Sequence, residues 1–386
     1  MSDRLDEKKL SHIDFEDITK ISYKDIVNSI NNDKKNISTF KPNNICKIDP
    51  RTNQRIVYSE VRAKRPHDNT QKTMEKQRVP CVVCNGNTTG IIDKTPLSEG
   101  FTFINKNLFP IVYPEHYSPE KIYMEPGKNN ISVHGEVAAG MHFVQWTSNY
   151  HDRDMSNMLP EDVETVLKRL ATFEGILLHA ADSQMPSTGE YERYEHFGYA
   201  GIIKNYGRLV GGSLAHDHQQ IIHTNIMPGK IKDDLMFKER FNITFPDFML
   251  KNNPDHLTLK ELKTIKIIVP YFMKRPLDTM IIFKDLSKNY LHDLNDMEIR
   301  ELSLALKTNL NAVPELMKKT GREPAYNVIF HNGPSTGLYV EVLPYTQETG
   351  GYEHLGIYIC QGSPELTVDM YREYFNDHCP PVTDHR

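Results

Sequence analysis

The stretch from Gly207 to Gln220 combines glycines, a serine, two histidines and a glutamine within 14 positions. If its end is extended, His216, His218 and Gln220 point to one face, because side chains alternate along a strand. The preceding glycines let backbone amides approach a phosphate closely, and a neutral imidazole beside such amides can attack phosphorus. The pattern indicates phosphoryl or nucleotidyl transfer. A glycine-rich turn before a strand with incidental histidines is the alternative.

A second group of residues with chemical potential begins at Cys81 and Cys84, whose spacing is typical of a zinc knuckle. The pair supplies two of four ligands, and no second CxxC follows, so histidines would complete a zinc site. His151 and His216 are the candidates, although spacing alone does not select His151 among the 17 histidines. A redox or unpaired cysteine pair is the alternative, but a redox motif normally sits at a strand-to-helix turn, whereas a polar loop follows here.

Length and composition exclude several classes of protein. The chain has 386 residues, which is enough for two domains or two packed halves. Its formal net charge of -5 argues against a dominant nucleic-acid-binding surface. No apolar run approaches the ~20 residues that span a bilayer, and residues 1–10 lack a signal-peptide core. Five cysteines, an odd number in a chain of this length, do not make a disulfide framework. We therefore expect a cytoplasmic protein with neither membrane nor nucleic acid as partner.

The elements that must position the motif are predicted from periodicity. Residues 1–45 are polar and are predicted as an extension with one short helix near 23–30. From Pro160 to about Ala181 apolar residues recur on one helical face. The predicted strands of this part are residues 52–62, 101–113 (entering a turn at Pro110), a pair within 132–147, and 199–204, with a loop at 66–80.

The rest of the chain repeats this order of elements. Residues 224–262 are poorly patterned and are predicted as a connector. Strands at 265–271 and 279–283, a helix at 296–319 and a strand pair at 326–330 and 338–343 follow. Because strand, strand, helix and strand occur twice, the pattern favours a duplicated α+β unit.

Several ordered segments resemble the galactose-1-phosphate uridylyltransferases, a branch of the histidine-triad superfamily that transfers nucleoside monophosphates. The resemblance covers residues 47–225 and rests on four motifs. These are Arg62–Pro66 (RAKRP), Cys81–Asn87 (the zinc segment), Ser148–His151 (S-P-x-H in the family), and Asn205–Gln220 (N-x-G, G-x-S, H-P-H-G-Q).

The resemblance implies an α+β fold of two histidine-triad-like halves, with antiparallel sheets and packed helices. The expected divisions are an N-terminal extension at 1–45, a first half with the zinc site and catalytic motif at 46–225, and a second half at 226–386. Family members are commonly homodimers with sites near the interface, so a homodimer is expected here.

The family's residue roles transfer to matching positions. His218 would be the nucleophile, Gln220 would hydrogen-bond the phosphoryl oxygens, and Ser213 with the preceding amides would hold the phosphates. Zn²⁺ would be structural, because four protein ligands leave no open position. The implied metal ligands are Cys81, Cys84, His151 and His216. The substrate-binding candidates are Arg62, Arg65, Asn107, Asn205, Gly211, Gly212, Glu353 and Glu365.

The sequence departs from the family at several points. Asp217 replaces a proline between the histidines and adds negative charge near a phosphate site, and Gln219 replaces a glycine. The late H-x-H of the family corresponds to Tyr339–Pro344, which has no histidine. The segment from Gly350 to Glu365 looks more like the branch that includes ADP-glucose phosphorylases, so galactose specificity is not supported.

The resulting prediction is a nucleotidyltransferase that moves a nucleoside monophosphate between a nucleoside diphosphate sugar and a sugar phosphate through a nucleotidyl-histidine. Hydrolysis or phosphorolysis of nucleotide sugars or dinucleotides is the alternative enzymatic function. A zinc-stabilised nucleotide-binding protein without turnover is the alternative from another class. The base, the sugar and the acceptor are not specified by the sequence.

Overall fold

The computed structural model describes residues 3–10, 12–33, 37–42, 44–49, 52, 54–64, 81–114, 122–126, 132–179 and 198–378. Its strands are β1 Ile45–Ile48, β2 Arg55–Tyr58, β3 Ile91–Pro96, β4 Phe101–Lys106, β5 Ile122–Pro126, β6 Ser132–Val137, β7 Gly140–Trp146, β8 Tyr199–Tyr206, β9 His218–Thr224, β10 Thr258–Glu261, β11 Ile265–Ile268, β12 Thr279–Phe283, β13 Tyr326–His331 and β14 Tyr339–Pro344. Its α-helices are α1 Tyr23–Asn31, α2 Pro160–His179, α3 Gly229–Phe241, α4 Phe245–Asn252, α5 Asp296–Lys319, α6 Gly351–His354 and α7 Pro364–His378.

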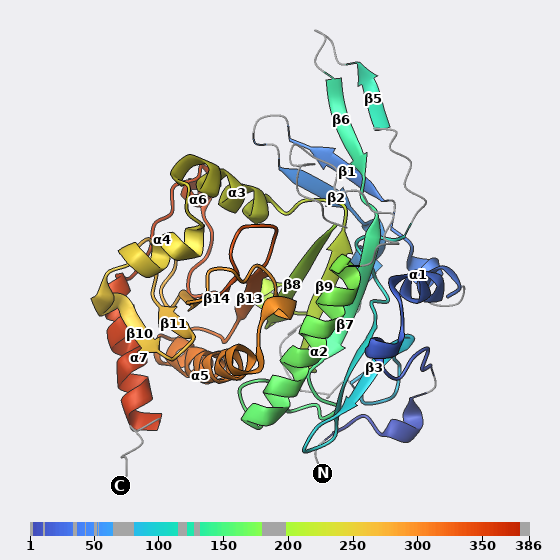
Figure 1. The fold of residues 1–386 in the computed structure, drawn as a ribbon, viewed down its shortest axis with the longest axis horizontal. Coiled ribbons are helices and arrows are strands. Elements are labelled where there is room, and N and C mark those ends of the chain that lie inside the picture. The colour runs from blue at the N-terminus through green and yellow to red at the C-terminus, as the bar shows by residue number, and fades with distance from the viewer. Residues whose placement is uncertain are drawn as a thin grey trace.

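A ten-stranded sheet forms the centre of the fold (Figure 1), with the order β10-β11-β12-β14-β13-β8-β9-β7-β4-β3. Every pairing in it is antiparallel. Outward from the central β13–β8 pair, the order β8-β9-β7-β4-β3 on one side matches β13-β14-β12-β11-β10 on the other. The expected α+β fold of two related halves with antiparallel strands is therefore confirmed.

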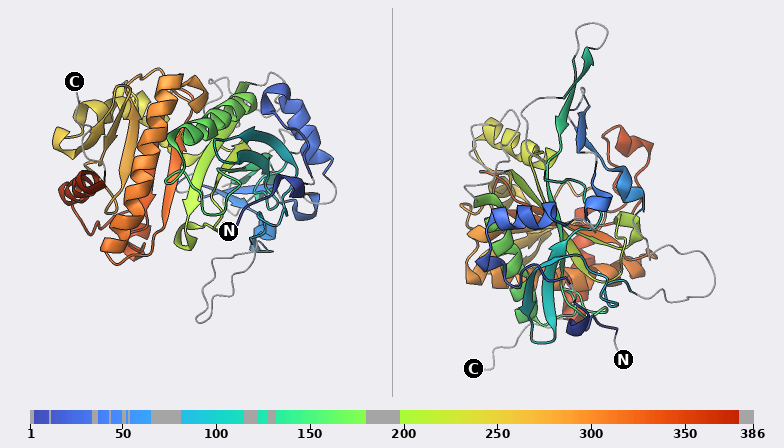
Figure 2. Two further views of the ribbon diagram at one scale, coloured as in Figure 1. Left: turned by 90° about the horizontal axis from the view of Figure 1, so that it is seen from below. Right: turned by 90° about the vertical axis from the view of Figure 1, so that its right-hand side faces the viewer.

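The two long helices α2 and α5 pack against each other across the junction of the halves (Figure 2). Helix α2 begins at Pro160 with acidic residues in its first turn, which the helix dipole favours. Helix α5 begins with a capping box between Asn295 and Glu298. The apolar faces of both helices meet one side of the sheet in one continuous hydrophobic core. The sheet's opposite face is left for other contacts.

The N-terminal segment is part of this packing. Helix α1 confirms the helix predicted near 23–30. Its Ile26 and Ile30 lie in the main core, and Leu5 packs beside Val83 and Trp146 in a smaller cluster. The segment at the start of the chain therefore contributes buried side chains to the fold. The proposed division at residue 45 stays a prediction.

Several local predictions were wrong. The predicted connector at 224–262 contains α3, α4 and β10. Helix α3 buries only Ile231, Asp234 and Leu235, so it lacks a continuous apolar stripe. The strand predicted at 52–62 is limited to β2, and a 3₁₀ turn follows. The strand predicted at 101–113 ends at Lys106. The loop predicted at 66–80 lies outside the described residues.

The strands predicted as a pair at 132–147 belong to different sheets. Strand β6 joins β2, β1 and β5 in a four-stranded sheet, whereas β7 lies in the central sheet. Alternation predicts strands but does not select their partners. The later pair, β13 and β14, does form as predicted. Among the described residues, no helix is both long enough and apolar enough to cross a membrane.

Candidate functional site

Strand β9 carries the motif histidine and glutamine on the sheet face away from α2. Trp146 of β7 is the register partner of His218, and Val144 that of Gln220. The alternate residue Ile221 belongs to the core formed with α2. Because side chains alternate along the strand, His218 and Gln220 share the opposite face. The period-2 inference made from the sequence therefore describes these two residues correctly.

Cys81, Cys84, His151 and His216 converge into one cluster, and their ligand atoms all lie within 4.8 Å of one another. The Sγ atom of Cys84 lies 3.6 Å from Nδ1 of His216 and 3.8 Å from Nδ1 of His151. Tetrahedral zinc with ordinary Zn–S and Zn–N bond lengths separates sulfur and nitrogen ligands by about 3.6 Å. The four donors therefore fit a tetrahedral metal site.

Hydrogen bonding and burial set the protonation of His216 and Cys84 in this cluster. Nε2 of His216 lies 2.8 Å from the Ser148 carbonyl oxygen, so Nε2–H can donate and Nδ1 can face the other ligands. Burial lowers the pKa of His216 to about 4, which keeps the imidazole neutral. Burial, followed by the charge of Cys81, raises the pKa of the Cys84 thiol to about 12. Without a cation the Cys84 thiol therefore stays protonated, and a metal ion bound to the cluster would be needed to hold it as a thiolate.

The N-terminal segment covers this cluster. The backbone N–H of His151 donates to the Asp3 carbonyl at 2.9 Å. Nζ of Lys9 donates to the Cys84 carbonyl at 3.3 Å. Gly86 has φ +84°, and a Cβ there would lie 2.8 Å from Cβ of Lys9. The turn after the cysteine pair thus requires glycine where the N-terminal segment passes over it.

The orientation of His218 fixes its tautomer. Its Nδ1 lies 2.8 Å from the carbonyl oxygen of His216, so Nδ1–H donates and Nε2 carries the lone pair. The imidazole is buried and lies 5.0 Å from the Trp146 ring, measured between centroids.

His142 is a site residue that the sequence reasoning missed. It lies on β7, and its Nε2 is 3.0 Å from Oε1 of Gln220 and 3.1 Å from Nδ2 of Asn107. With Oε1 engaged, the amide group of Gln220 is the end that can donate. The sheet face that carries His218 also carries His142, Val144 and Trp146 of β7. The sequence does not show that β7 pairs with β9, and this pairing was the information needed to find His142.

The glycine turn before the histidines is tightly packed. Gly211 has φ +86°, and a Cβ on Gly212 would lie 2.7 Å from the Gly207 carbonyl oxygen. Ser213 follows and is buried. Asn205, at the end of β8, accepts a hydrogen bond of 2.7 Å from Nδ2 of Asn327. Asn327 lies on β13, so the second half braces this side of the turn.

Arg62 lies in the 3₁₀ turn at Glu60–Lys64, and its Nη1 donates to the Phe109 carbonyl at 2.6 Å. The backbone N–H of Phe109 in turn donates to Oδ1 of Asn107 at 2.9 Å. Arg62 therefore positions the segment that carries Asn107. Arg65 lies outside the described residues.

Asp217 is neutralised on the helix side of the sheet. Its carboxylate pairs with Nζ of Lys204 and accepts a 2.6 Å hydrogen bond from Oγ1 of Thr147. The side chains of Lys204 and Asp217 are only 2% and 7% exposed. The negative charge expected near a phosphate is thus matched by a buried lysine.

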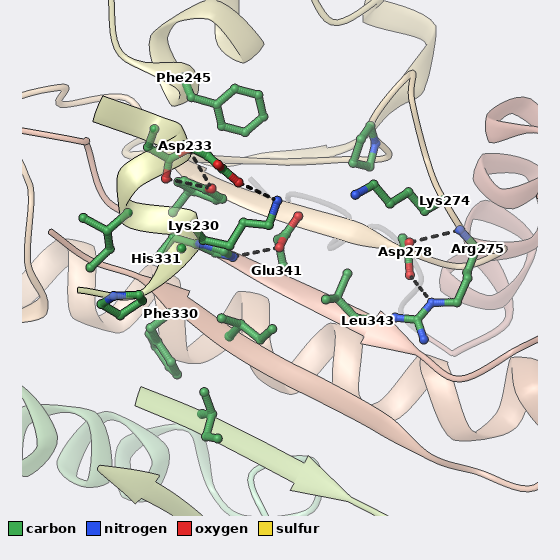
Figure 3. A pocket seen from close by; sticks show the side chains of 18 of the residues that line it. Lys230, Asp233, Phe245, Lys274, Arg275, Asp278, Phe330, His331, Glu341 and Leu343 are labelled. Atoms are coloured by element: carbon green, nitrogen blue, oxygen red, sulfur yellow. Dashed lines mark hydrogen bonds and ion pairs between the residues drawn. The ribbon is translucent and has the colours of Figure 1, made fainter. Parts of the chain in front are cut away.

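A cavity of about 690 Å³, shown in Figure 3, is lined mostly by the second half and also by residues 200–203 of β8. Glu353 lies at its edge on α6, and Glu365 lies on α7, 3.4 Å from Nε2 of His256. The structure groups the remaining described candidates around β9 and its neighbours, but places these two glutamates in the second half. His223, on the opposite face of β9 from His218, is buried against Tyr23.

Comparison with known proteins agrees with this architecture. No family model matches the chain. It is 23% identical over 346 residues to an ADP-glucose phosphorylase of Arabidopsis thaliana, covering 84% of this chain and 91% of that protein. It is 22% identical over 309 residues to a galactose-1-phosphate uridylyltransferase of Haemophilus influenzae, covering 75% of this chain and 79% of that protein.

Among solved structures, a uridylyltransferase superposes with a TM-score of 0.63 at 17% identity, covering 86% of this chain and 99% of that chain. The chain therefore has the fold of the uridylyltransferases. The resemblance to galactose-1-phosphate uridylyltransferases and ADP-glucose phosphorylases, stated from the motifs, is confirmed.

Proposed function

We propose that the protein is a nucleotidyltransferase that acts on a nucleoside diphosphate sugar through a covalent nucleotidyl-His218 intermediate. The observation that carries the proposal is the hydrogen bond from Nδ1 of His218 to the His216 carbonyl, which leaves the lone pair on Nε2. Relatives named as an ADP-glucose phosphorylase and a uridylyltransferase support nucleotidyl transfer or phosphorolysis.

In the first displacement, the Nε2 lone pair of His218 forms a bond to the α-phosphorus. The bond from that phosphorus to the bridging oxygen breaks, and the sugar 1-phosphate leaves with the electron pair. The imidazole gains positive charge, which the Nδ1–H bond to the His216 carbonyl stabilises. Covalent catalysis thus divides one difficult transfer into two easier steps.

In the second displacement, an oxygen of the acceptor phosphate bonds to the phosphorus, and the P–N bond returns its electron pair to Nε2. Gln220 would donate its amide hydrogens to the phosphoryl oxygens, because His142 engages the other end of the side chain. Ser213 and the amides of the glycine turn would offset charge at the phosphates. Asn107 and Asn205 would contact the nucleotide from either side.

Zn²⁺ is the metal that two thiolates and two imidazoles favour. Cys81, Cys84, His151 and His216 would hold it, and it would stabilise the local structure when bound. His216 then links the metal site to the nucleophile, since its carbonyl fixes the His218 tautomer.

A homodimer is also proposed, and exposed apolar residues of the second half support it. The exposed fractions are 76% for Leu355, 54% for Ile357 and 57% for Ile359. Such a run on a monomer's surface favours a protein interface. Light scattering coupled to size exclusion would test this, with a Leu355→Asp variant expected to shift the mass toward the monomer.

The experiment for the central proposal is intact-protein mass spectrometry after brief incubation with ADP-, UDP-, GDP- and CDP-sugars. A mass gain of one nucleoside monophosphate is expected, and its size names the base. His218→Ala should give none, whereas His256→Ala, which removes an exposed histidine, should behave as the wild type. No adduct with any donor, in folded and zinc-loaded protein, would refute the covalent intermediate.

Phosphorolysis is the second candidate, because the relative matched over 84% of this chain is named a phosphorylase. The isolated adduct can be offered inorganic phosphate, glucose 1-phosphate or water alone. The acceptor that discharges it fastest distinguishes phosphorylase, transferase and hydrolase.

A further inference from the structure

The rear face of the motif strand is polar, although it lies against the apolar core. Asp217 and Gln219 alternate with His218 and Gln220, so they point to the opposite side of the sheet. Both are buried, with exposed fractions of 7% and 1%, and the next residue on this side, Ile221, belongs to the main core. These are the two positions at which the histidine motif departs from the family. The polar rear face is therefore a property of this chain.

Asp217 is held by two neighbouring segments. Its Oδ1 pairs with Nζ of Lys204 on β8. Oγ1 of Thr147, just after β7, donates to Oδ2 at 2.6 Å, and the backbone N–H of Thr147 donates to the Asp217 carbonyl at 3.3 Å. The adjacent Ser148 carbonyl accepts a 2.8 Å hydrogen bond from Nε2 of His216. Residues 216 and 217 are thus fixed through both side chains and backbone.

Gln219 is held from the same direction. Its side-chain amide donates to Oε1 of Gln145, which is its register partner on β7. Nε2 of Gln145 in turn donates to the Val166 carbonyl on α2 at 3.0 Å. Hydrogen bonds are directional, so a fully bonded buried network specifies one position more strictly than apolar contacts do. Asp217 and Gln219 therefore fix the motif strand from the rear at two successive positions.

Stability alone does not account for the pair of Lys204 and Asp217. Both side chains are almost fully buried, at 2% and 7% exposure, and a buried ion pair loses the hydration of both charges. Apolar side chains of similar volume are often equally stabilising. The pair lies across the sheet from His218, so it acts on the nucleophile through the backbone. That backbone includes the His216 carbonyl, which accepts the 2.8 Å hydrogen bond from Nδ1 of His218.

We propose that Lys204 is a positioning residue for the nucleophile. Through Asp217 it holds the backbone at residues 216–218, so that the His216 carbonyl keeps its hydrogen bond with His218. The pair thereby does by charge what a proline at residue 217 does by its fixed backbone angle φ. The expected effect on rate rests on the proposed function of His218, whereas the effect on the tautomer of His218 does not.

Two double variants separate backbone restraint from charge. Lys204→Met with Asp217→Leu removes the pair and every side-chain anchor of residue 217. Lys204→Met with Asp217→Pro is equally uncharged but restrains φ through the ring. Intact mass measures single-turnover adduct formation with ADP-glucose and, in parallel, UDP-glucose.

At saturating donor the leucine variant should form the adduct about 30-fold more slowly than the wild type, because the nucleophile is misplaced. The donor concentration that gives half the maximal rate should change by less than about two-fold, since no substrate contact is removed. The proline variant should stay within about three-fold of the wild-type rate.

A second measurement does not require turnover. The NMR spectrum of zinc-loaded protein labelled with nitrogen-15 histidine shows which ring nitrogen of His218 carries hydrogen, and His218→Ala assigns the signal. The wild type and the proline variant should show Nδ1–H alone, whereas the leucine variant should show both tautomers. If no donor labels the wild type, the proposed function fails, but this spectrum still tests the positioning.

A milder variant keeps the test independent of folding. Thr147→Val removes one hydroxyl hydrogen bond at nearly constant volume and should slow adduct formation about five-fold. Thr308→Val, where the hydroxyl donates to the Leu304 carbonyl on α5, is the matched control and should have the wild-type rate. Equal rates for these two variants would overturn the proposal. A leucine variant as fast as the wild type, or with Nδ1–H alone, would also overturn it, as would a proline variant as slow as the leucine variant.

Discussion

The two halves share one framework and present different chemistry on it. Strand β9 in the first half and β14 in the second each pair with two strands in matching positions of the sheet order. Strand β9 carries His218 and Gln220 toward a glycine turn and a cluster of metal-binding residues. Strand β14 carries Tyr339 and Glu341 toward an open cavity. The framework therefore does not determine the chemistry, which depends on a few side chains on one face of each strand.

The nucleophile should give the largest difference between the halves. His218→Ala is expected to reduce turnover by roughly 10³-fold or more, because no other group replaces the attacking nitrogen. His256→Ala in the second half should retain wild-type kcat. Steady-state kinetics with the donor identified by mass spectrometry measures both. Comparable losses in the two variants would contradict the assignment of chemistry to β9.

The cysteines allow a similar comparison. Cys84→Ser should lose about one equivalent of zinc and on the order of 5 kcal/mol of the free energy of unfolding, since the metal joins distant segments. The Cys360 thiol in the second half donates a hydrogen bond to the Gly362 carbonyl. Cys360→Ser should therefore lower the free energy of unfolding by about 1 kcal/mol or less. Elemental analysis and denaturant unfolding measure the two effects. Full metal content in Cys84→Ser would refute the site.

The buried Lys204–Asp217 pair should be the next most sensitive feature. Lys204→Met leaves a buried carboxylate without its cation and is expected to cost about 3–5 kcal/mol. Adding Asp217→Asn should recover part of that loss. Lys318→Met, which removes an exposed pair with Glu315 on α5, should change stability by less than about 0.5 kcal/mol. Urea unfolding measures all three, and an undiminished loss in the double variant would contradict the pairing.

The smallest expected effect concerns the contact between the halves. Glu174 on α2 lies 2.7 Å from Nδ1 of His292, which follows β12. Burial alone would lower the pKa of His292, but the hydrogen bond and charge of Glu174 outweigh it and raise the pKa above 6.5. The stabilisation is therefore complete below pH 6.5 and is lost as the pH rises through the raised value.

His292→Gln should accordingly destabilise the protein by about 1–2 kcal/mol near pH 6, with a smaller difference at pH 9. Unfolding midpoints across this range provide the measurement. His256→Gln, an exposed control that pairs with Glu365, should show little difference at either pH. A gap for His292→Gln that widens toward pH 9 would show that the pair does not act as an ion pair.

The sequence predicted features that depend on nearby residues more accurately than features that depend on residues far apart in the chain. Helices α1, α2 and α5 were predicted within a few residues, because periodicity and capping act over one or two turns. The separation of β6 from β7 was not predicted, since strand partners depend on long-range pairing. Helices α3 and α4 were missed because their buried residues contact distant parts of the chain and leave little local periodicity.

The candidate site divides in the same way. His218 and Gln220 were assigned to one face from alternation alone, and the structure agrees. The role of His142 required the register between β7 and β9. The neutralisation of Asp217 required the position of Lys204 on β8.

The sequence by itself determined the types and local spacing of the chemical groups: a cysteine pair, two histidines separated by one residue, and a glycine turn. Only the tertiary structure decided that His151 and His216 join cysteines 67 and 135 residues away, respectively. It also decided that a cavity, lined mostly by the second half, lies beside β14, whereas β9 in the first half carries the motif. The reason is physical. Alternation and helical periodicity are local properties of the backbone, whereas a cluster or cavity exists only when burial of the whole core brings distant segments together.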